Sequence, residues 1–400
     1  MQRTLRTRRL PAHGARFGEV TVRTGFQDPE RGWVRCDAAP LLAADLAVPS
    51  RVRPAVDGPG EPNGVLLAVS YTDRRGVAAG FAVAAHRDDA ASVSAAEEAV
   101  DRWRGVLRSR RLVVADVPAL CWGGHRAVRM IKQRRPAVGL GLQSGDPADL
   151  PVVGDLVPDR GSVLIPSQGA TLAARAEIAA RGIPVVDATC PLVAAAQADA
   201  MARAADSDLV VVIGEPAHSA SRVLLTYAGE GAVLAGTAAD VAPLVAPSGN
   251  VSFVIEPGMS AERAMPVLRA LRARFPRLHG HHFDALCEAI SDREQTIASV
   301  AGASELTLVL AADPGEALRI TNLAAAPVQI VTRLEDVDLS VLNDVTTLGL
   351  VTGLSTEPEL SRELITAISG LGPLSVRRRS TRTRGYPARV SAPGPARRNV

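Results

Sequence analysis

The residues best suited to metal or redox chemistry in this chain are its four cysteines, Cys36, Cys121, Cys190 and Cys287. Each of the last three stands at a strand-to-helix junction or a helix start, where a thiolate is stabilised by the helix dipole and by free backbone N–H groups. They lie 69 residues (121 to 190) and 97 residues (190 to 287) apart, roughly one α/β subdomain each. Three similar subdomains could therefore bring one thiolate each to a shared centre.

Two kinds of role remain open for these cysteines. Free cysteine is among the most buried residue types, so a purely structural role is the simplest alternative. The sequence contains no CxxC pair, which argues against a zinc site or a thioredoxin-like dithiol. Three widely spaced soft ligands suit an iron–sulfur cluster instead, in which one iron would lack a protein thiolate.

Other chemically suggestive residues carry weaker signals. The tract HGHHFD (279–284) could bind a metal, but adjacent histidines in a connection between subdomains are first interpreted as an exposed loop. His125 follows Cys121 by four residues and either approaches the same centre or lies on a helix surface. The chain contains no GxGxxG, Walker A or GxSxG motif, so no motif supports a nucleotide-binding or serine-hydrolase function.

The elements that would position the cysteines begin near residue 111. Short apolar runs such as LVVADV (112–117), VLIP (163–166) and LVVVIG (209–214) each precede a helical segment rich in Ala, Leu and Arg. Continuous apolar strands followed by amphipathic helices are typical of parallel sheets with helices on both faces. Such sheets bind ligands at the carboxyl ends of their strands.

Residues 14–110 follow a different pattern and predict a small α+β module of unknown role that contains Cys36. The runs NGVLLAVSY and GVAAGFAVAA flank the turn TDRRG, which indicates a hairpin. The run SAAEEAVDRWRGVLRS indicates a helix with Ser92 or Ser94 as its N-cap.

The chain is predicted to divide into six segments. Both ends are basic and poor in apolar residues, and the C-terminal end is rich in Pro, Ser and Gly, so we expect disordered arms there. The segments are an arm at 1–13, the α+β module at 14–110, α/β lobes at 111–193, 194–286 and 287–372, and a tail at 373–400.

Composition narrows the class of protein. Apolar residues make up 47% of the chain and aromatic residues 3%, so Val, Leu, Ile and Ala must build the core, which suits α/β layers. Lys132 is the only lysine, and the arginines do not interleave with aromatics as in nucleic-acid binders. No apolar stretch approaches the roughly 20 residues that span a bilayer, and no secretory signal is recognisable. With few cysteines, we expect a cytoplasmic protein without a disulfide framework.

The segment VVDATCPLV (185–193) resembles the central signature of the 4-hydroxy-3-methylbut-2-enyl diphosphate reductase family, the last enzyme of the non-mevalonate isoprenoid pathway. Other segments resemble family motifs in the same order: LCWGGHRAV, IPSQGATLAARAEIAARG, VVVIGEPAHSA, CEAISDREQ and VTGLSTEPEL. The resemblance covers about residues 111–370. Only residues 187–193 are specific by themselves, and the collinear order of the three cysteines supports the rest.

The resemblance implies an α/β fold of three similar lobes, with mostly parallel sheets, around a central 4Fe–4S cluster held by Cys121, Cys190 and Cys287. The fourth iron of such a cluster binds the hydroxyl of an allylic alcohol substrate, which two electrons and two protons remove as water to give isopentenyl or dimethylallyl diphosphate. His218 and Ser355 match residues that bind the diphosphate. The electron donor would be a ferredoxin- or flavodoxin-like protein.

This sequence departs from the family at several polar positions. Positions that carry an acid, a histidine, two threonines, a serine and an asparagine in the family carry Ala220, Gln168, Pro257, Gly258, Gly315 and Ala317. Glu215 and Glu256 are candidate replacements for the acid, although each is first interpreted as a solvated surface residue, and the catalytic acid stays unassigned. Asp313 and Glu316 place negative charge in a loop where it would repel a diphosphate.

Three functional hypotheses follow. The first is an iron–sulfur reductase that carries out the family reaction. The second is a divergent paralogue that reduces a different substrate, including one without a diphosphate; the surviving cysteines and the altered polar positions favour it. The third is a non-enzymatic iron–sulfur redox sensor or partner-binding protein that uses the N-terminal module and the basic tail.

Overall fold

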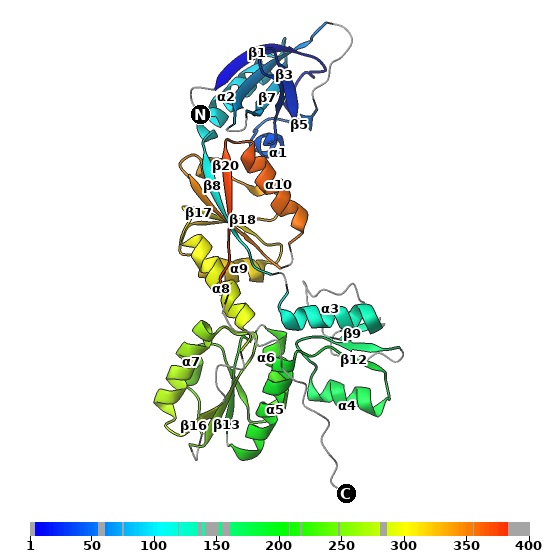
Figure 1. The fold of residues 1–400 in the computed structure, drawn as a ribbon, viewed down its shortest axis with the longest axis vertical. Coiled ribbons are helices and arrows are strands. Elements are labelled where there is room, and N and C mark those ends of the chain that lie inside the picture. Colours follow the sequence, from blue (N-terminus) through cyan, green and yellow to red (C-terminus); the bar gives the residue numbers. More distant parts are fainter. Residues whose placement is uncertain are drawn as a thin grey trace. The chain divides into compact units, whose positions relative to one another are not determined.

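The computed structural model describes residues 5–54, 61–73, 76–118, 120–134, 138–140, 152–153, 161–207, 209–216, 218–246, 249–280, 286–354 and 356–382. The chain divides into two compact units. Unit 1 comprises residues 1–116 and 296–379, and unit 2 comprises residues 117–295 and 380–400. The predicted fold class is confirmed: one mainly antiparallel sheet in unit 1 accompanies three parallel sheets with helices on their faces (Figure 1).

The N-terminal module, in unit 1, is a seven-stranded sheet with two helices. Strands β6 (Gly64–Thr72) and β7 (Ala78–His86) form the predicted antiparallel hairpin. The remaining elements are β1 (Arg6–Ala12), β2 (Val20–Arg23), β3 (Gly25–Asp28), β4 (Gly32–Arg35), α1 (Ala39–Ala44), β5 (Ser50–Arg53) and α2 (Ala90–Val106). Helix α2 begins earlier than predicted, because the Asp89 carboxylate, not Ser92 or Ser94, caps it by accepting a hydrogen bond from the Ser92 N–H.

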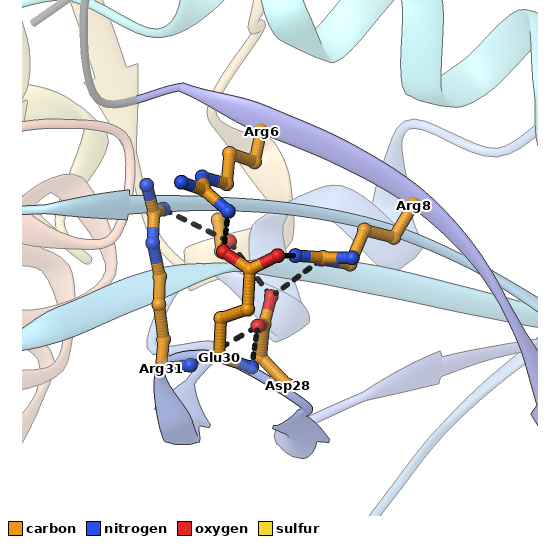
Figure 2. A network of polar contacts seen from close by, with 6 residues as sticks. Arg6, Arg8, Asp28, Glu30 and Arg31 are labelled. Atoms are coloured by element: carbon orange, nitrogen blue, oxygen red, sulfur yellow. Dashed lines mark hydrogen bonds and ion pairs between the residues drawn. The ribbon is translucent and has the colours of Figure 1, made fainter.

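The prediction of a disordered arm at residues 1–13 is wrong for β1. This strand pairs antiparallel with β6 along its whole length. It lies at the edge of the sheet, where charged side chains can face outward while the backbone is paired. Figure 2 shows Glu30 between Arg6 and Arg8, with Arg8 Nε also 3.4 Å from a carboxylate oxygen of the buried Asp28. These ion pairs fasten the basic strand to the β3–β4 hairpin.

The third lobe completes unit 1 as a five-stranded parallel sheet in the order β18-β17-β19-β8-β20. Its elements are β8 (Arg110–Ala115), α8 (Glu288–Ala301), β17 (Leu306–Leu310), α9 (Pro314–Leu323), β18 (Val328–Val331), β19 (Thr347–Thr352), α10 (Pro358–Ser369) and β20 (Leu374–Arg379). Side chains of α8 and α9 pack on one face of the sheet, and those of α10 pack on the other (Figure 1).

Two predicted boundaries are wrong in this lobe. Strand β8 was expected to open the first lobe, yet it pairs with β19 and β20 of the third. Strand β20 lies inside the expected disordered tail. Its basic side chains are exposed because β20 is the edge strand, so its composition resembles that of a solvated arm while its backbone is paired.

The N-terminal module and the third lobe share one continuous hydrophobic core, although the sequence separates them into two segments. At the seam the Tyr71 hydroxyl donates to the Ser369 carbonyl oxygen over 3.1 Å. The buried Arg110 guanidinium donates to carbonyl oxygens on both sides of the seam, those of Val106 and Leu371, at 2.7 and 3.2 Å. Burial lowers the pKa of Arg110 to about 10. Unit 1 is therefore a single packed body.

Unit 2 contains the first and second lobes, each a four-stranded parallel sheet. The first lobe holds α3 (Trp122–Arg134), β9 (Val138–Leu140), β10 (Val152–Val153), β11 (Val163–Ile165), α4 (Leu172–Ala180) and β12 (Val185–Asp187). The second holds α5 (Pro191–Asp206), β13 (Leu209–Ile213), α6 (Ser219–Tyr227), β14 (Val233–Ala235), β15 (Val251–Ile255), α7 (Ala261–Arg274) and β16 (Leu278–Gly280). In the second lobe, α7 packs on one face and α5 and α6 pack on the other (Figure 1).

None of the described helices combines the length and the apolar composition that a membrane crossing needs.

Candidate metal centre

The three cysteines predicted as ligands all lie in unit 2, each at the start of a helix. Cys121 directly precedes α3, and Cys287 directly precedes α8. Cys190 is the N-cap residue of α5, with Pro191 at the first helical position, where no backbone N–H is needed. The fourth cysteine, Cys36, is buried in unit 1, and burial raises the pKa of its thiol.

The sulfur atoms of the three residues converge. The side chains of Cys121 and Cys287 are hydrogen-bonded to each other. Gly123 lies against the other pair: a Cβ atom at this position would be 2.9 Å from the Cys190 Sγ and 3.7 Å from the Cys121 Sγ. The side chains of Cys190 and Cys121 thus lie against Gly123, and the side chain of Cys121 also contacts that of Cys287.

The three thiols have different proton affinities. The hydrogen bond from Cys287 lowers the pKa of Cys121 to about 5, with further help from the backbone N–H groups of Gly124 and Gly123. The same bond, together with burial, raises the pKa of Cys287. Burial also raises the pKa of Cys190. Of the three thiols, Cys121 is therefore the one that loses its proton most readily.

The backbone around Cys190 is held by side chains that sequence reasoning missed. The Arg175 guanidinium donates to the Asp187 carboxylate and to the Thr189 hydroxyl, both at 2.8 Å. The Thr189 N–H donates to the same carboxylate at 3.0 Å. On the other side, the Arg126 guanidinium donates to the Thr189 carbonyl oxygen at 3.0 Å. The segment Asp187–Cys190, here called the DATC turn, is thus held on both sides by arginine side chains, which fix the position of the Cys190 backbone.

The donor set fits an iron–sulfur cluster better than a single ion. Among the described residues, no group of three or more His, Cys, Asp or Glu side chains has the geometry to bind one metal ion. A 4Fe–4S cluster takes each thiolate on a different iron, so its ligands need not surround one point. Three converging thiols, with a glycine against two of them, match that requirement.

The histidines near these elements do not add to the thiol group. His125 is exposed on α3, and His279 is exposed in β16. The rest of the histidine-rich tract, residues 281–284, lies outside the described residues, as does the predicted diphosphate-binding Ser355.

Glu256 and His218 form a pair in the second lobe. Glu256 follows β15, and its side chain is 3% exposed, so the expectation of a solvated surface residue is wrong. One carboxylate oxygen lies 3.2 Å from the His218 Nδ1, and the other accepts a hydrogen bond from the Gly258 N–H at 2.7 Å. His218 is the N-cap residue of α6.

The second carboxylate suggested by the sequence, Glu215, has a different environment. It forms an ion pair with Arg263, whose guanidinium also lies 3.8 Å from the Glu294 carboxylate. Arg263 therefore joins the loop before α6 to α7 and α8. This arrangement stabilises the lobe and leaves Glu215 paired with a permanent cation.

In unit 1, two acidic residues occupy the start of α9. The Asp313 carboxylate accepts from the Glu316 N–H at 2.6 Å and caps the helix. The Glu316 side chain is 8% exposed and accepts from the Leu354 N–H at 2.7 Å. Negative charge is thus built into this loop, as the sequence indicated.

Comparison with a solved structure gives the class of fold. The structure of E-1-hydroxy-2-methyl-but-2-enyl-4-diphosphate reductase from Plasmodium falciparum covers 69% of this chain and 94% of its own, with a TM-score of 0.59 and 16% sequence identity. At that identity the likeness establishes the fold, the α/β architecture of this reductase.

Sequence comparison gives the family. Residues 112–369 match the family model described as LytB protein. The 4-hydroxy-3-methylbut-2-enyl diphosphate reductase 2 of Mycobacterium bovis is 33% identical over 253 residues, which are 61% of this chain and 77% of that relative. The 4-hydroxy-3-methylbut-2-enyl diphosphate reductase of Gluconobacter oxydans is 26% identical over 315 residues, 72% of this chain and 93% of that relative. The chain belongs to the LytB protein family, whose named relatives are reductases.

Proposed function

We propose that this chain is an iron–sulfur reductase that converts 4-hydroxy-3-methylbut-2-enyl diphosphate to isopentenyl and dimethylallyl diphosphate. In this reaction two electrons and two protons enter, the allylic C–O bond breaks, and the hydroxyl leaves as water. The convergence of Cys121, Cys190 and Cys287, in a chain of this family, carries the proposal. The altered polar positions had favoured a paralogue with a different substrate, but the named relatives are all reductases of this diphosphate and support the family reaction instead.

The proposed cofactor is a 4Fe–4S cluster bound by the three thiolates. When bound, such a cluster supplies single electrons and an iron without a thiolate that acts as a Lewis acid. Cys121 already has a thiolate-favouring environment, whereas Cys287 and Cys190 must each lose a proton to become ligands. The absence of a side chain at Gly123 leaves Cys190 and Cys121 free to face the same centre.

His218 and Ser355 are the proposed contacts to the diphosphate. His218 stands at the N-terminus of α6, where backbone N–H groups and the helix dipole favour an anion. We assign no catalytic acid, because Glu215 is paired with Arg263 and both oxygens of Glu256 have protein partners, the Gly258 N–H and the His218 Nδ1. A ferredoxin- or flavodoxin-like protein is the proposed electron donor, and the cytoplasm is the proposed compartment.

Cluster binding is tested by anaerobic reconstitution with iron and sulfide. We expect roughly four irons per chain and absorbance near about 400 nm. Cys121→Ser, Cys190→Ser and Cys287→Ser should each lose most of the iron. Cys36→Ser is the matched control and should retain it, because Cys36 lies in the core of unit 1. Full iron content in Cys190→Ser would exclude the proposed ligand set.

Turnover is tested with the reconstituted protein, a chemical reductant and 4-hydroxy-3-methylbut-2-enyl diphosphate. We expect both isomeric diphosphates as products, measured by mass spectrometry. Reconstituted cluster without any turnover, under conditions where a named relative is active, would contradict the proposed reaction and leave the cluster assignment intact.

A further inference from the structure

The Glu256 carboxylate is an internal anion at the carboxyl end of the second-lobe sheet. It follows β15, and its own N–H donates to the carbonyl oxygen of Ile213, the last residue of β13, at 2.8 Å. Ligands of parallel α/β sheets bind at this edge. The side-chain partners of Glu256 are the His218 Nδ1, at a helix N-terminus, and the Gly258 N–H. With a proton on Nδ1, the two groups form a pair of donors suited to a phosphate oxygen.

Gly258 and Glu256 depend on each other sterically. A Cβ atom at position 258 would lie 2.7 Å from one Glu256 carboxylate oxygen and 3.2 Å from the other. No side chain at position 258 can therefore coexist with the carboxylate in its present place. The carboxylate of Glu256 fills the space that the missing side chain of Gly258 leaves, so its position depends on a glycine at residue 258.

One buried hydroxyl beside Glu256 lacks a protein partner. Ser221 is fully buried, and its hydroxyl has no hydrogen-bond partner among the described residues. The Ser221 Oγ and the Glu256 Cβ lie 2.5 and 3.2 Å from the same point, the place of a Cβ on Gly214. Buried hydroxyls without partners are costly, and a bound polar group would satisfy them.

The third lobe, in unit 1, repeats the arrangement independently. The buried Glu316 carboxylate accepts from the Leu354 N–H, and a Cβ atom on Gly353 would lie 2.7 Å from a Glu316 oxygen. Again a carboxylate fills the space beside a glycine and binds a backbone donor in the loop after a parallel strand.

We propose that Glu256 is a specificity-determining residue that competes with a phosphate group of the substrate for the His218 imidazole and the Gly258 N–H. This inference rests on the proposed function for the identity of the substrate. A phosphate oxygen can take these two donors only if the carboxylate moves away, and the displaced negative charge then stays close to the diphosphate. Glu256 therefore weakens diphosphate binding and sets how strictly the site demands a diphosphate.

The test is the binding of inorganic pyrophosphate to the reconstituted holoenzyme, measured by calorimetry at constant ionic strength. Glu256→Gln keeps the shape of the side chain and removes the charge, so the dissociation constant should fall about tenfold. Glu262→Gln is the matched control. It removes the same charge from an exposed residue at the start of α7 and should change the dissociation constant less than about twofold.

Equal or weaker pyrophosphate binding by Glu256→Gln, relative to Glu262→Gln, would overturn the inference. If Glu256→Gln does not retain wild-type iron content, Glu256→Asp decides instead, because the shorter carboxylate cannot hold both donors and should also bind pyrophosphate more tightly than wild type. A fall in the kcat of Glu256→Gln with unchanged pyrophosphate affinity would indicate that Glu256 is a catalytic group. That result would also overturn the inference.

Failure of this inference can be told apart from failure of the proposed function. Tighter pyrophosphate binding by Glu256→Gln, in a protein that does not reduce 4-hydroxy-3-methylbut-2-enyl diphosphate, would support the inference and contradict the proposed reaction. Normal turnover by the wild type, with the same KM in Glu256→Gln and Glu262→Gln, would support the proposed reaction and contradict the inference.

Discussion

At the scale of single residues, the three cysteines show which parts of a candidate site residue types alone reveal. The cysteines were recognisable because thiolates at helix starts are chemically distinctive and their motifs are collinear with those of a family. Gly123 carried no such signal, since its importance comes only from the distance to Cys190 and Cys121 across the fold. Glu256 was misjudged because a charged residue is usually exposed, and its partners lie on another element and in the following turn.

Gly123→Ala tests the steric requirement of the thiol group. The added Cβ would lie 2.9 Å from the Cys190 Sγ, so the sulfur must move, at an expected cost on the order of 1–3 kcal/mol. We expect a clearly lower iron content after reconstitution. Gly124→Ala is the control, because the atoms nearest to its Cβ would belong to the Leu120 side chain, the first at 3.2 Å, and not to a cysteine. Wild-type iron content in Gly123→Ala would show that the sulfurs do not need this space.

The unequal proton affinities of the thiols predict selective alkylation of the metal-free protein. Because the pKa of Cys121 is lowered to about 5, this thiol is ionised above that pH, while those of Cys190 and Cys287 stay protonated at neutrality. At about pH 6.5, iodoacetamide should modify Cys121 first, as followed by peptide mass spectrometry. Cys287→Ala removes the hydrogen bond and should slow this modification. Equal rates at the three cysteines would contradict the assigned hydrogen bond.

At the scale of elements, the helices and strands were largely predictable from periodicity, and their partners were not. The runs that predict β11 and β13 are continuous apolar segments, which local composition reveals. Strand β8 has the same composition, but its local sequence does not indicate that it pairs with β19 and β20 of the third lobe. Strands β1 and β20 were missed because an edge strand needs only one paired side and tolerates charged residues.

The link between α4 and the DATC turn predicts a measurable contribution to stability. Burial alone would raise the pKa of Asp187, but hydrogen bonds from Arg175 and Thr189 outweigh it and lower that pKa. Arg175→Ala should reduce the free energy of unfolding by about 1–2 kcal/mol in urea titrations at neutral pH.

The pH dependence of this effect has a defined sign. A carboxyl with a lowered pKa contributes stability that is present above its unfolded value and lost as pH falls through the folded one, so the effect should shrink below about pH 4. Arg181→Ala, which removes an exposed pair with Glu177, is the control and should cost less than about 0.5 kcal/mol. A similar cost for both variants would show that the DATC turn does not depend on Arg175.

At the scale of the whole molecule, the N-terminal module is a structural part of unit 1. Its core is continuous with that of the third lobe, and the seam requires close backbone contact: a Cβ atom on Gly370 would lie 2.4 Å from the Ala38 N. Gly370→Ala should therefore lower the thermal midpoint of unit 1 by several degrees, for a cost of about 1–3 kcal/mol. Gly105→Ala, whose Cβ would meet nothing closer than 3.9 Å, should leave it unchanged or raise it. Equal midpoints would show that the seam can open without loss.

The sequence by itself determined the α/β class, most helices and strands, the three cysteines and the family resemblance, because these follow from local periodicity and from residue types with distinctive chemistry. Only the tertiary structure decided that β8 and β20 belong to the third lobe, that the module shares its core, that Gly123 must lack a side chain and that Glu256 is buried against His218. Each of these depends on distances between residues far apart in the chain. Such distances are set by packing and nonlocal strand pairing, which no local pattern encodes.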